Sequence, residues 1–480
     1  MKSLLIGLCL CFTAPLFAQL PHILPLEKRG EVEDRWLKER FETVAPMLMR
    51  RAGINLWLLI SREYNEDPVL KTMLPSSWLS ARRTTMLVIY DNGDTLETLA
   101  CARYDVGEVF KKAWDKEREP DQWKRLRQLI EERDPQRIGV NRSEHFGLAD
   151  GLSSYHYDKL MATLPDKYRE RVVSAEPLAI GWLETRTDSE MTVYQQVCRI
   201  AHAIIREGFS EEVIQPGVTT TDDVVWYYRR RINELGLDAW FHPTVDIQRA
   251  DPESFDHLRS FSKRPEQQVI MPGDLVHCDF GITYLGLNTD TQENAYILRP
   301  GETDAPDYLK DAFAKGLRLM DILTDEFAVD RSGNEILADA LTNAKSEGLK
   351  PTIYTHPIGY HGHGAGPTIG LWDQQGGVPV RGDYPMYANT AYSIELNTAV
   401  YLEEWGKEIR MMMEEDAYFD GETVRYIDGR QTELFLIPRP MPSVGPMGGA
   451  QGKRSGTVRD GQGRSGTVRG GGGGQGRRGG

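Results

Sequence analysis

The segment DLVHCDFGITYLGLNTDT, residues 274–291, constrains the fold and chemistry of this protein most strongly. Its residues alternate as in a β-strand, and Tyr284-Leu285-Gly286 has the composition of a tight turn, so a strand-turn-strand unit is predicted. That unit brings Asp279 close to Asp290, eleven positions later. A carboxylate inside an apolar strand carries a large desolvation penalty unless it is paired or binds a metal. Taken alone, the two aspartates are consistent with turn, salt-bridge or metal-binding roles.

Three further motifs follow downstream. His363 stands between Gly362 and Gly364, where the absence of side chains lets the backbone approach a ligand closely. Glu395 lies in a strand-like run at 391–396, and Glu414 lies in the run at 410–419. Each motif by itself is compatible with a glycine-rich loop, an edge strand or a solvated charge.

The order Asp279, Asp290, His363, Glu395 and Glu414 resembles the metal ligands of the pita-bread metallopeptidases, namely methionine aminopeptidase, aminopeptidase P, prolidase and creatinase. The resemblance covers about residues 187–437. It implies that Asp279 binds one ion, that His363 and Glu395 bind a second, and that Asp290 and Glu414 bridge them. The family's frame favours Glu414 over Glu415, and strand alternation allows only one of the two to point inward. Carboxylate and imidazole ligands suit two divalent ions, with manganese preferred over cobalt, iron or zinc.

The resemblance also implies catalytic roles. Glu395 is expected to relay a proton, and His257 or His361 to position the substrate, with His242 as a third candidate. Two departures concern the substrate. Leu396-Asn397 replaces the family's Pro-Gly after the glutamate, and Gly370 stands where the peptidases carry a histidine seven residues after the metal ligand.

The implied activity is that of an Xaa-Pro aminopeptidase or dipeptidase, with peptides carrying proline at the second position as partners and a homo-oligomeric assembly. A creatinase-type hydrolase of a small C–N substrate and a binding protein that has lost catalysis are the alternatives. The net charge of −14 argues against nucleic-acid binding by the body of the protein.

The fold class expected is α+β, with a smaller creatinase-like α/β domain at 27–185 before a pita-bread catalytic domain at 187–439. In the first domain we expect a helix at 31–51 that ends at Gly53, and strands at 54–60, 84–90 and 95–101. In the second, a capping box from Thr187 to Glu190 begins a helix. Helices near 222–236, 306–327 and 334–347 then predict a duplicated unit of helix pair and antiparallel sheet.

The two ends of the chain differ from its body. Residues 1–18, with Lys2 before an apolar run, read as a signal peptide and predict a periplasmic or secreted protein. No later stretch has the composition of a membrane span. Residues 440–480 are rich in glycine and arginine and are expected to be disordered. Cys101, Cys198 and Cys278, odd in number and widely spaced, predict free, buried thiols.

Overall fold

The computed structural model describes residues 21–251 and 267–439. The predicted signal peptide, the tail at 440–480 and the candidate His257 therefore lie outside the described residues.

The first part of the chain forms a six-stranded mixed sheet in the order β4-β3-β2-β1-β5-β6. Its strands are β1 (Leu56–Arg62), β2 (Thr84–Asp91), β3 (Leu96–Ala100), β4 (Lys111–Lys112), β5 (Ile138–Val140) and β6 (Val172–Ser174). Its helices are α1 (Leu26–Ala52), α2 (Pro68–Lys71), α3 (Gln122–Arg133), α4 (Ser154–Thr163), α5 (Asp166–Arg169) and α6 (Glu176–Glu184), with a 3₁₀ turn, η1 (Gly147–Ala149). As predicted, α1 ends at Gly53, whose φ of 62° is left-handed.

Alternation along β1 gives this sheet two apolar faces. Trp57 and Leu59 pack with α1 and α6, whereas Leu56 and Leu58 pack with α3 and α4 on the other side. A sheet buried on both faces by helices is the α/β layering expected from the sequence.

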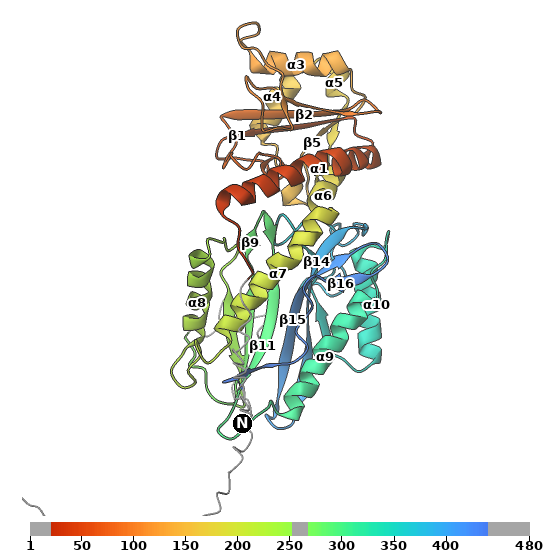
Figure 1. Ribbon diagram of the computed structural model, residues 1–480. Helices are drawn as coiled ribbons and strands as arrows, with labels where there is room; N and C mark the ends of the chain where they lie inside the picture. Colours follow the sequence, from red (N-terminus) through yellow and green to blue (C-terminus); the bar gives the residue numbers. More distant parts are fainter. Residues whose placement is uncertain (1–20, 252–266, 440–480) are drawn as a thin grey trace, which may run out of the picture. The chain divides into compact units, whose positions relative to one another are not determined.

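The second part of the chain contains a nine-stranded sheet with the main order β12-β14-β15-β11-β8-β7. Its strands are β7 (Thr244–Gln248), β8 (Leu275–Phe280), β11 (Thr291–Ile297), β12 (Pro351–Ile353), β13 (His356–Pro357), β14 (Thr390–Leu402), β15 (Lys407–Phe419), β16 (Val424–Tyr426) and β17 (Phe435–Ile437). Its helices are α7 (Asp188–Gly208), α8 (Thr221–Glu234), α9 (Asp307–Thr324) and α10 (Gly333–Ser346). The predicted sequence of helix pair, sheet, helix pair, sheet is confirmed (Figure 1).

The predicted tight turn joins two short strands, β9 (Thr283–Tyr284) and β10 (Leu287–Asn288). Leu285 and Gly286 both have positive φ, 54° and 72°, as a two-residue hairpin turn with right-handed twist requires. Beyond the hairpin, β8 and β11 pair antiparallel, so that Asp279 lies opposite Gln292.

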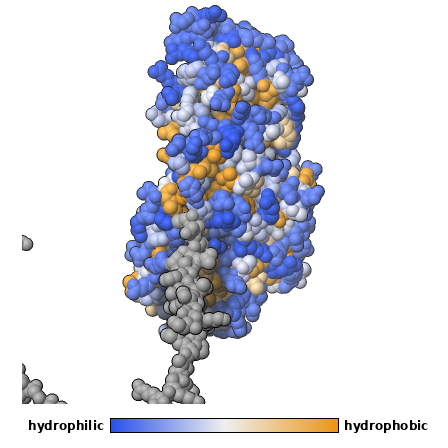
Figure 2. Space-filling model, viewed as in Figure 1, coloured by the Kyte–Doolittle hydropathy of each residue, from blue (hydrophilic) through white to orange (hydrophobic). Residues whose placement is uncertain are grey.

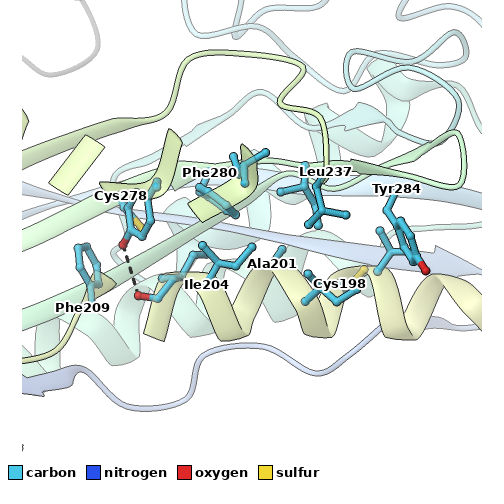
Figure 3. Packing of buried hydrophobic residues seen from close by; sticks show 14 of the residues in the cluster. Cys198, Ala201, Ile204, Phe209, Leu237, Cys278, Phe280 and Tyr284 are labelled. Atoms are coloured by element: carbon cyan, nitrogen blue, oxygen red, sulfur yellow. Dashed lines mark hydrogen bonds between the residues drawn. The ribbon is translucent and has the colours of Figure 1, made fainter. Parts of the chain in front are cut away.

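The nine-stranded sheet has one apolar face and one polar face. Val276, Cys278 and Phe280 of β8 pack against α7 and α8, as Figure 3 shows for Phe280 and α7. Met411 and Met413 of β15 pack against α9 and α10. We call this side the helix face. The residues that alternate with these, including Asp279 and Glu414, point to the opposite side, which we call the front face.

Helix starts follow the capping signals in the sequence. Capping boxes begin α7 at Thr187, α8 at Thr220 and α10 at Ser332, each with its two reciprocal hydrogen bonds. Cys101, Cys198 and Cys278 are free and buried, as predicted.

The surface seen in Figure 2 is mainly hydrophilic, with hydrophobic residues in separate groups. Among the described residues, none of the helices is both long and apolar enough to cross a membrane.

A buried ion pair links α1 to the start of α7. Arg40 Nη1 lies 3.2 Å from Glu190 Oε2, and both side chains are fully buried. Arg40 also donates to the carbonyl oxygens of Thr185 and Trp182. Glu190 in turn accepts from the hydroxyl of Tyr360, at 2.6 Å. Although burial raises it, the guanidinium groups of Arg186 and Arg40 hold the pKa of Glu190 below its usual value.

Replacing Arg40 by methionine is expected to lower the free energy of unfolding by about 3 kcal/mol, because it leaves a buried carboxylate with one fewer counter-charge. Arg50→Met is the matched control. Arg50 pairs with Asp91 but its side chain is 53% exposed, and such pairs contribute less than about 1 kcal/mol. Urea unfolding of both variants measures the difference. Equal losses would show that the buried pair has no special role.

Candidate metal centre

Five side chains from five neighbouring segments meet on the front face of the nine-stranded sheet. Asp279 is on β8, Asp290 directly precedes β11, His356 is on β13, Glu395 on β14 and Glu414 on β15. The strand register explains the meeting, because Glu395 lies opposite Glu414, Glu414 opposite Gln292, and Gln292 opposite Asp279. Three of the carboxylates, those of Glu395, Glu414 and Asp279, therefore lie in one row that crosses the paired strands β14, β15, β11 and β8.

Their donor atoms form overlapping groups of a size that suits metal ions. Asp279, Asp290 and Glu414 each offer one atom within 4.8 Å of the others, and so do His356, Glu395 and Glu414. Glu414 belongs to both groups, as a bridging ligand between two ions would. A third group joins Asp290, His356 and His363.

His356 is surrounded by acceptors that it does not reach directly. Its Nε2 lies 3.6 Å from Asp290 Oδ2, 3.7 Å from Glu414 Oε1 and 3.9 Å from Glu395 Oε2. Donor atoms that share one ion at bonds of 2.0–2.2 Å lie about 3–4 Å apart. The distances from His356 Nε2 to the three carboxylates are therefore too long for hydrogen bonds but suit donor atoms that bind one shared ion.

The electrostatics of the cluster favour a cation. Burial, and then the charge of Glu414, raise the pKa values of both Asp290 and Glu395 well above their usual range. Although burial lowers it, the neighbouring carboxylates of Glu414 and Glu395 raise the pKa of His356 to about 9. Buried carboxylates this close together repel unless positive charge is placed among them.

The residues present fit the divalent ions that the resemblance implies. Four carboxylates and an imidazole form an oxygen-rich donor set of the kind that binds manganese, cobalt, iron or zinc. Within the described part of the chain, Asp290 Oδ1 and His356 Nε2 are buried with no hydrogen-bond partner. Buried polar atoms are normally satisfied, so two such atoms in one cluster indicate the place of a ligand.

Neighbouring groups hold the carboxylates in position. Ser393 Oγ donates to Glu414 Oε1 at 2.6 Å, and the amide of Gln292 donates to Glu395 at 2.7 Å and to Glu414 at 2.8 Å. The orientation of Gln292 is fixed by His277 Nε2, which lies 2.8 Å from its carbonyl oxygen and must therefore donate. These contacts align two glutamates before any ion is bound.

Sequence reasoning did not identify His356, and it assigned the ligand role to His363. The structure places His356 within 4 Å of three carboxylates, while His363 is exposed and packs edge-on against His356 and Trp240. The overlooked signal was spacing. His363 follows His356 by seven positions, which is the spacing at which the resemblance implies a second histidine after the metal ligand.

The remaining candidates have different surroundings. Glu414 faces the front cluster and Glu415 the helix face, as the alternation predicted. His361 is partly buried, and burial with the charge of Arg186 lowers its pKa to about 4. His242 is exposed and contacts Trp226 and Arg229 of α8. Neither His361 nor His242 belongs to a metal-ligand group among the described residues.

The glycines beside His363 serve packing. A Cβ on Gly362 would meet the Trp240 ring at 2.4 Å, and one on Gly364 would meet the carbonyl oxygen of Pro357 at 2.6 Å. The close approach of this loop to Trp240 therefore depends on Gly362, and its close approach to β13 depends on Gly364.

The fold and the cluster together define a metallohydrolase-type centre on an α+β scaffold. Residues 192–422 match the model of metallopeptidase family M24, in agreement with the pita-bread resemblance. No curated protein sequence matches the chain.

Solved structures support the fold over a longer span. An X-Pro aminopeptidase from Thermotoga maritima matches with a TM-score of 0.58 and 16% identity, over 81% of this chain and 99% of that one. An Xaa-Pro dipeptidase from Bacillus anthracis gives 0.53 and 17%, over 86% and 100%. A putative aminopeptidase P from Bacillus anthracis gives 0.54 and 11%, over 82% and 96%. The pita-bread resemblance and the α+β fold class are thereby confirmed.

Proposed function

We propose that this protein is an exported metallopeptidase that removes the N-terminal residue preceding proline, as an Xaa-Pro aminopeptidase or dipeptidase. The observation that carries the proposal is the convergence of Asp279, Asp290, His356, Glu395 and Glu414 on one face of the sheet. Similarity of the fold to an X-Pro aminopeptidase and an Xaa-Pro dipeptidase favours the proline specificity. Manganese is the preferred ion, and a homo-oligomer the preferred assembly.

We assign His356 and Glu395 to one ion, Asp279 to the other, and Asp290 and Glu414 to both. Bound there, two divalent ions would supply Lewis acidity to the scissile carbonyl and to a water nucleophile. The protein's own contribution is to fix the ligands in advance, since Ser393 and Gln292 already orient Glu414. Because Glu414 is already oriented, its carboxylate needs little reorganisation when the ions bind.

Glu395 is the proton carrier in this proposal. Its side chain is 17% exposed, against 1% for Glu414 and 6% for Asp290, so it is the most open to water of the three. One carboxylate oxygen can take the proton of the attacking water and deliver it to the leaving nitrogen. His363, exposed beside His356, is placed to donate a hydrogen bond to the substrate.

Proline at the second position presents a distinctive recognition problem. An X–Pro bond is a tertiary amide with no N–H, so the usual backbone hydrogen bond of a substrate is missing. A preformed pocket for the rigid ring replaces that contact with little loss of entropy.

Manganese-loaded protein is expected to release the first residue of X–Pro and X–Pro–Y peptides, to cleave X–Ala peptides far more slowly, and to leave N-acetylated X–Pro peptides intact. Chromatographic detection of the released amino acid measures all three. The Glu395→Gln variant, purified in parallel, controls for contaminating peptidases. Failure on every free X–Pro peptide at full metal content would favour a small-molecule C–N hydrolase or an inactive binder. Cleavage of acetylated peptides at the same rate would remove the exopeptidase assignment.

A further inference from the structure

A second cluster of metal-binding side chains lies on the helix face of the nine-stranded sheet. His202 of α7, Glu293 of β11 and Glu415 of β15 each offer one donor atom within 4.8 Å of the others. The three residues are only 4%, 1% and 2% exposed. Glu293 and Glu415 directly follow Gln292 and Glu414, so alternation places this cluster on the opposite side of the same two strands from the front-face centre.

The histidine is oriented as a metal-ligating histidine usually is. Asp428 Oδ2 lies 3.3 Å from His202 Nδ1 and can accept its proton. With the proton on Nδ1, the lone pair of Nε2 points into the cluster, where Glu415 Oε2 lies 3.0 Å away. A carboxylate behind the ligating imidazole fixes the tautomer and ring orientation in many metal sites. Arg199 in turn holds Asp428, at 2.6 Å.

Each of the two glutamates has an oxygen that can serve the cluster. Glu415 Oε1 accepts from the backbone N–H of Gln431 at 3.0 Å, so its Oε2 is the atom that faces His202. Glu293 Oε2 is buried and, within the described part of the chain, has no hydrogen-bond partner. Burial raises the pKa of Glu293 to about 7. An unsatisfied carboxylate oxygen on a residue that also offers a donor atom within 4.8 Å of an imidazole and a second carboxylate marks a place where a cation would be stabilised.

A pocket lies beside one member of the cluster. Glu293 lines a pocket of about 380 Å³ together with Gln431 and Arg206. Three protein ligands and one water complete the tetrahedral shell that zinc prefers with nitrogen and oxygen donors.

We propose that His202, Glu293 and Glu415 bind a divalent transition ion, with zinc as the best fit, in a structural site distinct from the front-face centre. The ion ties α7 to β11 and β15, the strands that carry Gln292 and Glu414. It stabilises the fold and takes no part in the reaction, because it lies on the other side of the sheet. The proposal is independent of the peptidase assignment.

The experiment uses the full chain with Glu414→Ala, which cripples the front-face centre and leaves the second cluster intact. Zinc titrated into this variant is expected to raise its melting temperature, and elemental analysis after gel filtration is expected to retain zinc. Adding Glu293→Gln should remove about one zinc per chain and the melting shift that depends on it, because the amide resembles a protonated glutamate in size and charge but is a poor ligand. Glu408→Gln, at an exposed glutamate of β15, is the matched control.

Two further measurements keep the test decisive. Cobalt in place of zinc should give the visible absorption of a low-coordinate nitrogen and oxygen site in Glu414→Ala, and not in the double variant. Asp428→Asn should weaken zinc binding about 10–100-fold, since it removes only the group behind the imidazole.

The competing state is an ion pair without metal, in which a proton shared by His202 and Glu415 occupies the centre of the cluster. Burial lowers the pKa of His202, but Glu415 and Asp428 raise it well above its usual value. Identical zinc content and melting shift in Glu414→Ala with and without Glu293→Gln would establish that state and overturn the proposal.

Discussion

Glutamine in place of Glu395 is expected to lower kcat for an X–Pro substrate by about 10²–10⁴-fold, the usual contribution of a positioned general base or acid. The side chain keeps its length, and its amide can still pack against the neighbours, but it cannot take and return a proton. Steady-state turnover at saturating manganese, with metal content measured on the same sample, separates loss of the proton carrier from loss of an ion.

The matched control is Glu408→Gln, on the same strand as Glu414 and paired at the surface with Lys350. Its turnover should equal that of the unaltered protein. A drop of less than about threefold in Glu395→Gln, smaller than general acid–base catalysis contributes, would mean that another residue moves the proton. In that event His363 would become the first candidate, because it is exposed beside the cluster.

The resemblance to the metallopeptidases predicts most of the centre, and long, regular strands decide which side of the sheet its glutamates face. Glu395 and Glu414 belong to the 13-residue strands β14 and β15, where a period of two decides which side chains share a face. The same period separates Glu414 from Glu415. The hairpin turn between Asp279 and Asp290 could also be predicted from local sequence. In the structure, Leu285 and Gly286 both adopt the positive φ of such a turn.

His356 was harder to find because its strand has only two residues, His356–Pro357. So short a strand has no measurable periodicity, and its pairing with Tyr392 and Ser393 of β14 depends on the tertiary fold. The glycines around His363 drew attention to that histidine and away from His356. They allow close packing against Trp240 and Pro357 rather than ligand contact. The spacing of seven residues between the two histidines was the stronger signal.

The contacts of Gln292 and the cluster at His202 could not be predicted from the sequence, for a different reason. Gln292 reaches the glutamates only through cross-strand register, and a glutamine in a strand suggests no chemistry by itself. His202 lies on α7, far in sequence from Glu293 and Glu415, and looks like one polar residue on an apolar helix. Only the packing of α7 on the sheet brings the three together.

Alanine substitutions of His356 and His363 are expected to have clearly different effects on metal content and turnover. His356→Ala should remove about one ion per chain and abolish turnover, because its Nε2 lies within 4 Å of Asp290, Glu395 and Glu414. His363→Ala should keep its metal and lower kcat/KM, because an exposed histidine beside the cluster contacts the substrate rather than the ion.

Each variant is the control for the other, since both remove an imidazole and both disturb the ring contact between His356 and His363. Metal content by elemental analysis is the primary measurement, and kcat/KM for an X–Pro dipeptide the second. Retention of both ions in His356→Ala with loss of one in His363→Ala would restore the assignment made from sequence. Loss of an ion in both would mean that the two imidazoles share it with Asp290, a grouping that the structure also allows. Intact metal with reduced kcat/KM in His363→Ala alone would fix the ligand as His356 and the substrate contact as His363.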